Sequence, residues 1–227
     1  VKLSDDIKRQ TEEQMRQGTD VNKLYFEGRS QNALYAVPSL GIDPSSGIEY
    51  FLTKEGQITD TWSAKDKVYM GVAEPAYRGN VSTMFRWKDL TLNLSFAYHW
   101  GGKLYNQTLI DRVEMPYSSL EHKNVDRRVF TDRWTKPGDL AFFKGMYKVY
   151  EATRSSSRFV MPDKVFEFAT ANLQYRLATE KMKRAGIDVV NFGVNMSDIF
   201  YWSKTKQERG LNYPFARNAA VTVGIMF

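Results

Sequence analysis

The last eleven residues of the sequence are Arg217-Asn218-Ala219-Ala220-Val221-Thr222-Val223-Gly224-Ile225-Met226-Phe227. Every second residue from Ala219 to Phe227 is apolar, so a strand formed here has one apolar face, and mostly small or weakly polar residues occupy the other. This pattern, ending on an aromatic residue, is typical of the last strand of an outer-membrane β-barrel. A half-buried strand of a soluble protein that happens to end in Phe fits the stretch equally well.

A predicted β-hairpin in the middle of the chain separates these two interpretations. Residues 80–87 alternate apolar and polar side chains, Lys88-Asp89 forms a minimal turn, and residues 90–100 keep the same period of two. Tryptophan or tyrosine stands near both ends of the hairpin, as in membrane-spanning strands with aromatic anchors. Strands of soluble sandwiches are usually five or six residues long, so the length favours a barrel.

Further strands are predicted at 165–177 and 190–196, with a charged connection at 178–186 and a polar loop from about residue 198 to 216. Residues 101–157 lack sustained periodicity, and we expect a long loop there, ending the preceding strand at Gly101-Gly102. Long loops on one side and short turns on the other are normal for a transmembrane barrel. The fold class predicted is therefore all-β, with antiparallel transmembrane barrel strands and little helix.

Two regions follow from this pattern. Residues 1–77 are expected to be an extracellular loop region, with a short helix capped by Ser4 and a hairpin whose tip is Gly41–Gly47. Residues 78–227 are expected to carry the barrel strands and their extracellular loops. Within the long loop, a short helix is predicted near residues 124–134, with Val129 and Arg133 on one face.

Composition excludes several classes of protein. Cysteine is absent, which excludes disulfides and thiolate metal sites, and no apolar run reaches the ~18 residues of a transmembrane helix. The 32 basic and 26 acidic residues are interspersed, so no nucleic-acid partner is expected. No catalytic motif, cofactor site or metal site is visible around His99 or His122, and we expect the protein not to be an enzyme.

The best candidates for recognition lie in the long loop, because loops on a rigid scaffold commonly carry binding residues. Self-packing of the loop is the alternative explanation for its aromatic residues. Three arginines of the loop, Arg127, Arg128 and Arg133, are expected to brace it against Asp126 and Asp132. The candidates for contact with a substrate or a covering protein are Trp134, Phe142, Phe143, Tyr147, Tyr150, Arg127, Arg128 and Arg133.

Several motifs in order resemble the C-terminal part of the SusC/RagA family, the TonB-dependent outer-membrane transporters of Bacteroidetes. The resemblance covers roughly residues 24–227. The motifs are Gly-Ile-Asp-Pro-x-x-Gly (41–47), Gly-Gly-Lys-Leu-Tyr-Asn (101–106), Asn-Val-Asp-Arg-Arg (124–128), Asp-Arg-Trp-Thr-Lys-Pro-Gly-Asp (132–139), Ser-Arg-Phe-Val (157–160), Asn-Met-Ser-Asp-Ile-Phe (195–200), Tyr-Pro-Phe-Ala-Arg (213–217) and the terminal Phe227.

This resemblance implies a 22-stranded barrel in the outer membrane of a Gram-negative cell. It also implies a plug, energy coupling through TonB, a SusD-like surface lipoprotein as a lid, and import of oligosaccharides or peptides. Phe227 would then be the terminus read by the barrel-assembly machinery. The sequence shows no signal peptide, TonB box or plug, so we expect a piece of a larger transporter or an unusual separate chain.

The alternative function is a free-standing β-rich surface module that binds carbohydrate or protein. The apolar faces of the strands distinguish the two hypotheses. A barrel wall turns them outward in a continuous band towards lipid, whereas a module gathers them into one buried core. The residues that decide this are Leu92, Leu94, Phe96, Val190, Phe192, Val221 and Val223.

Overall fold

A computed structural model of the chain describes residues 2–18, 20–115, 125–148, 152–205 and 217–227. The chain forms two compact units, each built from two separate stretches of sequence. The first unit comprises residues 1–74 and 102–162, and the second comprises residues 75–101 and 163–227.

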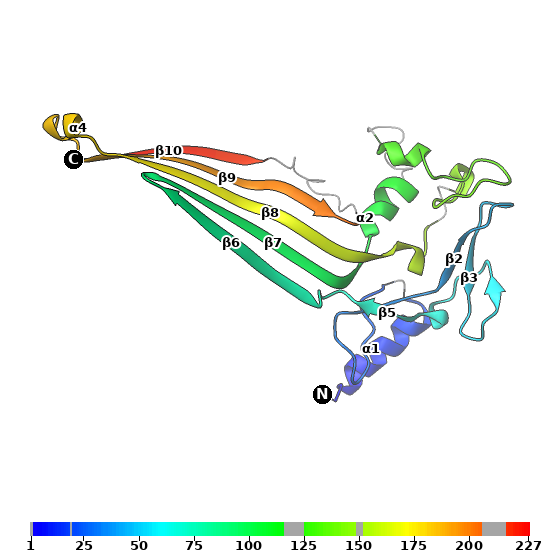
Figure 1. Cartoon of the computed structure of the whole chain (residues 1–227). Coiled ribbons are helices and arrows are strands. Elements are labelled where there is room, and N and C mark those ends of the chain that lie inside the picture. Colours follow the sequence, from blue (N-terminus) through cyan, green and yellow to red (C-terminus); the bar gives the residue numbers. More distant parts are fainter. Residues whose placement is uncertain (1, 19, 116–124, 149–151, 206–216) are drawn as a thin grey trace. The chain divides into compact units, whose positions relative to one another are not determined.

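The second unit is an open, five-stranded antiparallel sheet in which neighbours in sequence are neighbours in space (Figure 1). Its strand order is β10-β9-β8-β7-β6. Both β7 and β8 continue beyond this unit into the first. The strands are β6 (Tyr77–Trp87), β7 (Leu90–Tyr105), β8 (Val160–Leu177), β9 (Val189–Ser203) and β10 (Asn218–Met226), with helix α4 (Glu180–Arg184) between β8 and β9. The predicted antiparallel all-β fold class is confirmed, and the described sheet is not closed into a barrel.

The hairpin of β6 and β7 follows the sequence pattern without irregularity. Its register runs from Tyr77 opposite Trp100 to Trp87 opposite Leu90. Lys88 turns the chain with a positive φ of 53°. The strand β7 does not end at Gly101-Gly102 as predicted but continues to Tyr105. Gly102 fits here because a Cβ atom would lie 3.0 Å from the carbonyl oxygen of Ala73.

The prediction of a polar loop from about residue 198 is wrong for residues 198–203, because β9 continues to Ser203. The register between β8 and β9 shifts by one residue between Phe168 and Thr170. Asp198 adopts a positive φ of 54° at this point, which lets β9 accommodate an extra residue as a β-bulge. After the bulge the alternation resumes with aromatic residues, and Phe168 faces Phe200.

The first unit contains short strands and helices around small hydrophobic clusters. Strand β1 pairs with β5, and the predicted hairpin is confirmed as β2 and β3, followed by β4. Ser4 caps α1 as predicted, with its hydroxyl accepting from the amide of Ile7. The elements are α1 (Asp5–Arg16), β1 (Ala33–Ala36), β2 (Ser39–Ile42), β3 (Glu49–Leu52), β4 (Ile58–Thr59), η1 (Ala64–Asp66), β5 (Val68–Val72), α2 (Gln107–Leu109), η2 (Ile110–Glu114), η3 (Arg127–Phe130), η4 (Met146–Lys148) and η5 (Ser157–Phe159).

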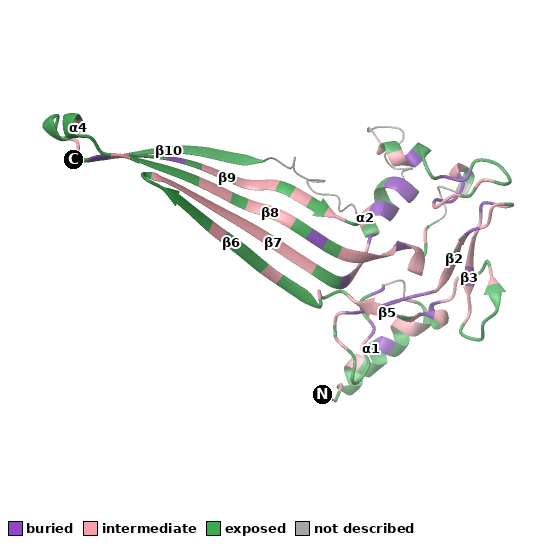
Figure 2. Cartoon of the chain, viewed as in Figure 1, coloured by how far each residue is buried: buried purple, intermediate pink, exposed green. Residues whose placement is uncertain are grey.

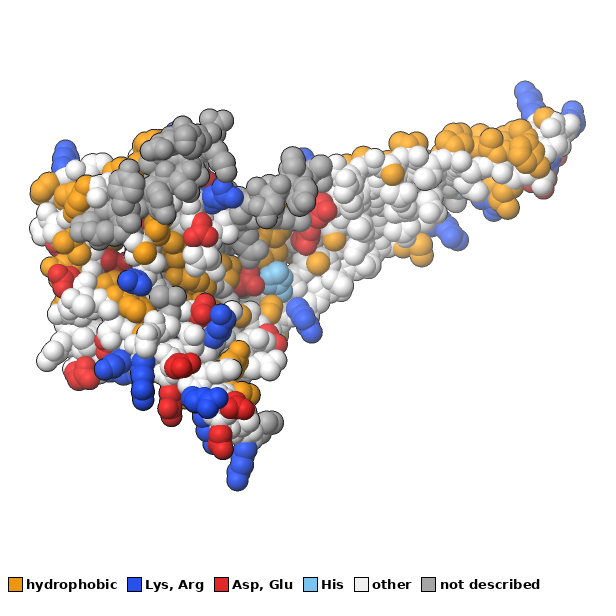
Figure 3. Space-filling model, turned by 180° about the vertical axis from the view of Figure 1, so that it is seen from behind, with side chains coloured by type: hydrophobic (Ala, Val, Ile, Leu, Met, Phe, Trp, Pro, Cys, Tyr) orange, Lys and Arg blue, Asp and Glu red, His pale blue; other side chains and the backbone are white. Residues whose placement is uncertain are grey.

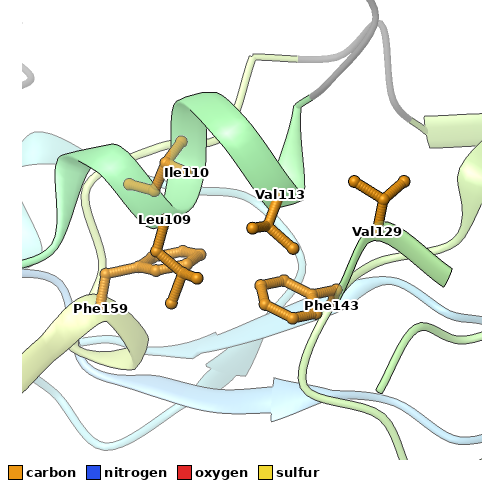
Figure 4. Close-up of a cluster of buried hydrophobic side chains, with 6 residues drawn as sticks. All are labelled: Leu109, Ile110, Val113, Val129, Phe143 and Phe159. Carbon is orange, nitrogen blue, oxygen red and sulfur yellow. The ribbon is translucent and has the colours of Figure 1, made fainter. Parts of the chain in front are cut away.

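The long loop expected at residues 101–157 contains, in its described parts, more local structure than the single short helix predicted there. Short helical turns there bring together a hydrophobic cluster (Figure 4). The helix predicted near residues 124–134 is present only as the single turn η3. Buried residues are concentrated in this unit, whereas the sheet carries mostly exposed and intermediate residues (Figure 2). The cluster consists of Leu109, Ile110, Val113, Val129, Phe143 and Phe159.

Candidate functional site

The described part of the long loop (residues 102–115, 125–148 and 152–157), named the recognition loop after its predicted role, contacts the tip of the β2–β3 hairpin through Trp134. The indole of Trp134 is buried, and its Nε1 donates to the carbonyl oxygen of Pro44 at 2.8 Å. The ring of Tyr147 meets the indole edge-on at 5.8 Å, and the Tyr147 hydroxyl donates to the carbonyl of Ser46. Gly47 lies against the same indole, where a Cβ atom would be 2.6 Å from Cδ2. The loop and the hairpin tip therefore form one packed surface.

Two aspartates shape this surface through local hydrogen bonds. The carboxylate of Asp43 accepts from the hydroxyls of Ser45 and Ser46, and these bonds lower the pKa of Asp43. The carboxylate of Asp139 accepts from the hydroxyl of Thr135 and from the amides of Thr135 and Lys136, which lowers the pKa of Asp139. Both aspartates therefore stay ionised at neutral pH and hold their turns closed.

Arg133 ties the recognition loop together from the inside. Its side chain is buried, and Nε and Nη1 donate to the carbonyls of Val129 and Lys144, each at 2.8 Å. Nη2 donates to the carbonyl of Val113. Burial lowers the pKa of Arg133, and the nearby carboxylate of Glu114 opposes that shift. Arg133 thus braces the loop through backbone carbonyls. Within the described residues, its side chain makes no hydrogen bond to the expected partner Asp132.

A buried charge cluster anchors the same loop to the β2–β3 hairpin. Arg158 Nη2 lies 2.8 Å from Glu49 Oε2 and 2.7 Å from Glu114 Oε1. Burial alone would lower the pKa of Arg158, but the two carboxylates more than offset it and raise that pKa. Glu49 Oε1 also accepts from the hydroxyls of Ser39 and Ser156, at 2.6 and 2.7 Å.

The remaining members of this cluster are aromatic. Arg158 Nη1 donates to the carbonyl oxygen of Phe142 at 2.6 Å. Its guanidinium carbon lies 4.5 Å from the ring centre of Phe159 and 5.5 Å from that of Phe142. Tyr105 packs beside them, and burial raises the pKa of its hydroxyl, with Glu49 adding to the shift.

A small cavity opens beside the charge cluster. Its volume is about 110 Å³, and both basic and acidic side chains reach it. The lining residues are Gly47, Ile48, Glu49, Phe51, Asp60, Lys144, Ala152, Thr153 and Arg154. This space is adequate for a single functional group of a ligand and is too small for an oligomer.

The candidate residues of the loop occupy very different environments. Trp134, Phe143 and Arg133 are buried, Phe142 is partly buried, and Tyr147 and Arg127 are exposed. The predicted carboxylate partner of Arg128 is confirmed, since its Nη2 lies 2.7 Å from Asp126 Oδ2. Tyr150 lies outside the described residues. Contact of any of these side chains with a substrate or covering protein stays a prediction, as does the assembly role of the exposed Phe227.

Sequence reasoning missed Glu49, Glu114 and Arg158. Arg158 belongs to the Ser157–Val160 motif that contributed to the family resemblance, but no spacing signal links it to its partners. They lie 109 and 44 residues away along the chain. Only the three-dimensional structure brings these charges together.

The sheet of the second unit has two chemically different faces. Cross-strand partners lie on the same face, so the register groups the side chains directly. One face carries mainly uncharged polar residues, and white atoms, which are backbone as well as uncharged polar side chains, predominate over the sheet in the view of Figure 3. On this face Asn172 bonds Asn195, and His99 Nε2 lies 3.1 Å from Asp163 Oδ2. The other face is apolar.

The described part of the chain contains neither a metal-binding cluster nor a helix suited to a membrane. No group of three or more His, Asp or Glu side chains there is placed to hold a metal ion. No helix among the described residues is long and apolar enough to cross a membrane.

Comparison with known proteins finds similarity at the level of fold. No protein-family model and no curated protein matches the sequence. The structure is similar to the RagAB peptide importer in its open-open state (TM-score 0.64, 16% identity), covering 81% of this chain and 21% of that one. It is also similar to the importer in its closed-closed state (TM-score 0.60, 17% identity), covering 76% of this chain and 20% of that one. A third similar structure is that of the RagAB peptide transporter (TM-score 0.62, 18% identity), covering 76% of this chain and 19% of that one. The chain thus spans about a fifth of the length of the chains it matches.

Proposed function

We propose that this chain is a C-terminal barrel segment of a SusC/RagA-like, TonB-dependent importer of peptide or glycan oligomers in the outer membrane of a Gram-negative cell. In this role the five-stranded sheet is part of the barrel wall. The recognition loop and the β2–β3 hairpin belong to the extracellular surface, where a SusD-like lipoprotein and the substrate are met. In this proposal the importer draws its energy through TonB.

The apolar face of the sheet is the observation that carries this proposal. The register places Val194 beside Val221 and Phe192 beside Val223, and the same alternation runs through Leu92, Leu94 and Phe96 on β7. None of these residues is buried, and Val221 is 74% exposed. A face this apolar is unfavourable in water and is what lipid requires of a barrel wall.

Strand length supports the same conclusion. A transmembrane strand needs about 9–11 residues, and β10, the shortest strand of the sheet, has 9. Strands β7 and β8, with 16 and 18 residues, are longer than a bilayer requires. Such lengths exceed the usual five or six residues of strands in soluble sandwiches.

The free-standing module is less well supported. Such a module would bury the apolar face of its sheet against a second layer. The three clusters of buried hydrophobic residues found in the described part of the chain all belong to the first unit. The described part of the second unit therefore supplies no layer of its own for the sheet face, and a lipid environment accounts for that face better.

The partner and the substrate class of the proposal rest on resemblance. The fold is similar to structures described as a RagAB peptide importer, and the ordered sequence motifs resemble the SusC/RagA family. In this chain Tyr147 and Arg127 are exposed at the loop surface, whereas the buried Trp134 supports that surface through its contacts with Pro44 and Tyr147.

A genetic and fractionation experiment tests the proposal. The full-length natural protein, tagged at an exposed loop, is expected in the outer-membrane fraction, and its deletion is expected to abolish uptake of a labelled peptide or oligosaccharide pool. Tyr147→Ala should lower uptake without lowering the amount of protein in the membrane, whereas the exposed Lys54→Ala serves as a control. Recovery of the protein in the soluble fraction would overturn the proposal.

A further inference from the structure

A groove on the apolar face of the sheet has features that a plain lipid-facing wall does not need. Its volume is about 540 Å³, and it lies across β7, β8 and β9. Because these are the three central strands of the described sheet, the groove is complete without any neighbouring strand. Its lining residues are Tyr98, His99, Trp100, Lys164, Val165, Phe166 and Trp202.

Aromatic rings form the floor and walls of this groove. Tyr98 and Trp100 stack with their ring centres 4.8 Å apart. Phe166 stacks on Phe96 at 5.8 Å and lies directly opposite Trp202 in the register. Trp100, Phe166 and Trp202 remain 44%, 42% and 57% exposed. Flat aromatic walls left open in this way suit an extended hydrocarbon chain.

Two lysines stand at one end of the aromatic groove. Lys164 lies two residues before Phe166 on β8, so it projects from the same face about 7 Å further along the strand. Lys204 follows β9 opposite Lys164, and its amide donates to the Lys164 carbonyl at 3.2 Å. Both side chains are exposed. The sheet thus presents a pair of ammonium groups next to a hydrocarbon-binding surface.

The nearby carboxylates do not neutralise this pair. Asp163 lies on the polar face, where it pairs with His99. Glu167 stands opposite Tyr201, on the face away from Phe166 and Phe168. Within the described residues no ion pair joins Lys164 or Lys204 to a carboxylate. Among the described residues, therefore, no carboxylate opposes the positive charge that an anionic ligand meets here.

We propose that this groove is a specific binding site for a phosphorylated lipid. The phosphate lies between the ammonium groups of Lys164 and Lys204, and an acyl chain runs along Trp100, Phe166 and Trp202. Lysines near a membrane surface attract anionic headgroups, and aromatic residues mark the level of the interface. The inference rests on the proposed function, because it requires the apolar face to meet lipid.

Native mass spectrometry of the purified full-length protein tests the site. Phosphatidic acid is the probe, and diacylglycerol is the same lipid without its phosphate. The wild-type protein should retain phosphatidic acid in preference to diacylglycerol. The double variant Lys164→Gln/Lys204→Gln should bind phosphatidic acid about tenfold more weakly or worse.

Lys88→Gln is the matched control. Lys88 is also an exposed lysine beside a tryptophan, with its Nζ 5.3 Å from the ring centre of Trp87, but it stands at the β6–β7 turn and does not line the groove. This variant should bind phosphatidic acid like the wild type. Equal binding of both lipids, or unchanged phosphatidic acid binding by the double variant, would overturn the site.

Two further readouts separate this inference from the proposed function. If inorganic phosphate alone, measured by calorimetry, binds as tightly as phosphatidic acid, the groove is an anion site and the lipid assignment is wrong. If the double variant stays in the outer membrane and imports substrate but binds lipid normally, only the lipid site fails. A wild-type protein found in the soluble fraction would overturn both proposals.

Discussion

Arg158 Nη2 lies 2.8 Å from Glu49 Oε2, although 109 residues separate the two along the chain. The same nitrogen lies 2.7 Å from Glu114 Oε1, and all three side chains are nearly or completely buried. Because Glu49 belongs to β3 and Glu114 to η2, one guanidinium joins the hairpin to the recognition loop. This cluster holds the surface that we assign to recognition.

Replacing Arg158 tests how much the first unit depends on this cluster. Arg158→Met should destabilise the unit by about 3 kcal/mol or more, because it leaves two buried carboxylates without a counter-charge. The measurement is the denaturant concentration at which trypsin first cleaves the recognition loop in the full-length protein. Arg9→Met, which removes the exposed Arg9–Asp6 pair, should change the stability of the unit by less than about 1 kcal/mol. If Arg158→Met lowered the stability of the unit as little as Arg9→Met does, a supporting role for Arg158 would be contradicted.

The contact of Gly47 with Trp134 predicts a sensitive glycine. Gly47→Ala should destabilise the hairpin tip by more than the roughly 1–2 kcal/mol that a positive φ costs, since the new methyl group would also clash with the indole. Gly56→Ala is the control, because Gly56 has a φ of +81° but open space around it. The same trypsin assay should rank Gly47→Ala well below Gly56→Ala in stability. The reverse order would show that the indole is not packed on the tip.

The buried amine of Lys67 predicts a pH dependence of stability. Burial lowers the pKa of Lys67 to about 8, and its Nζ donates to the carbonyl of Asp20 at 2.7 Å. Between pH 8 and the ordinary pKa near 10.5, the unfolded state binds more protons than the folded state, so stability rises with pH. Unfolding midpoints of the first unit at pH 7.5 and 9.5 should show this rise in the wild type and not in Lys67→Met. A rise of equal size in Lys67→Met would contradict the assignment.

A pair of adjacent substitutions on β7 tests the two faces of the sheet. Leu94→Arg places a charge on the apolar face and should cost about 2–4 kcal/mol if it meets the lipid midplane. Asn93→Arg points to the polar face and should be tolerated. The amount of folded protein in the outer membrane, relative to wild type, reports the difference. Equal loss in both variants would argue against a lipid-facing surface.

The sequence predicted the elements whose hydrophobic pattern has a clear period. The alternation at Leu90–Trp100 identified a strand and its two faces, and Ser4 identified the start of α1, because both signals are local. The extension of β9 past Asp198 was missed, since an Asp with positive φ in a bulge is indistinguishable from a loop residue in the sequence.

The candidate site was predicted less well than the sheet. The turns of 107–114 and 127–130 are too short to show a helical period, so their hydrophobic cluster was not anticipated. Trp134 was identified from its residue type, but its role as a buried support of the hairpin tip required the structure. The charge cluster of Arg158 depends on contacts far apart in sequence, which single-sequence patterns do not encode.

Spin-label accessibility along β7 of the full-length protein in a lipid bilayer tests the central claim most directly. This chain contains no cysteine, so once any cysteine elsewhere in the full-length protein has been replaced by serine, a cysteine introduced at Leu94 or Ser95 gives the single labelling site. A label at Leu94 should collide with oxygen dissolved in lipid, and one at Ser95 with a water-soluble nickel complex, with the preference alternating through Phe96 and Ala97. Access of the nickel complex to both faces alike would contradict a membrane wall.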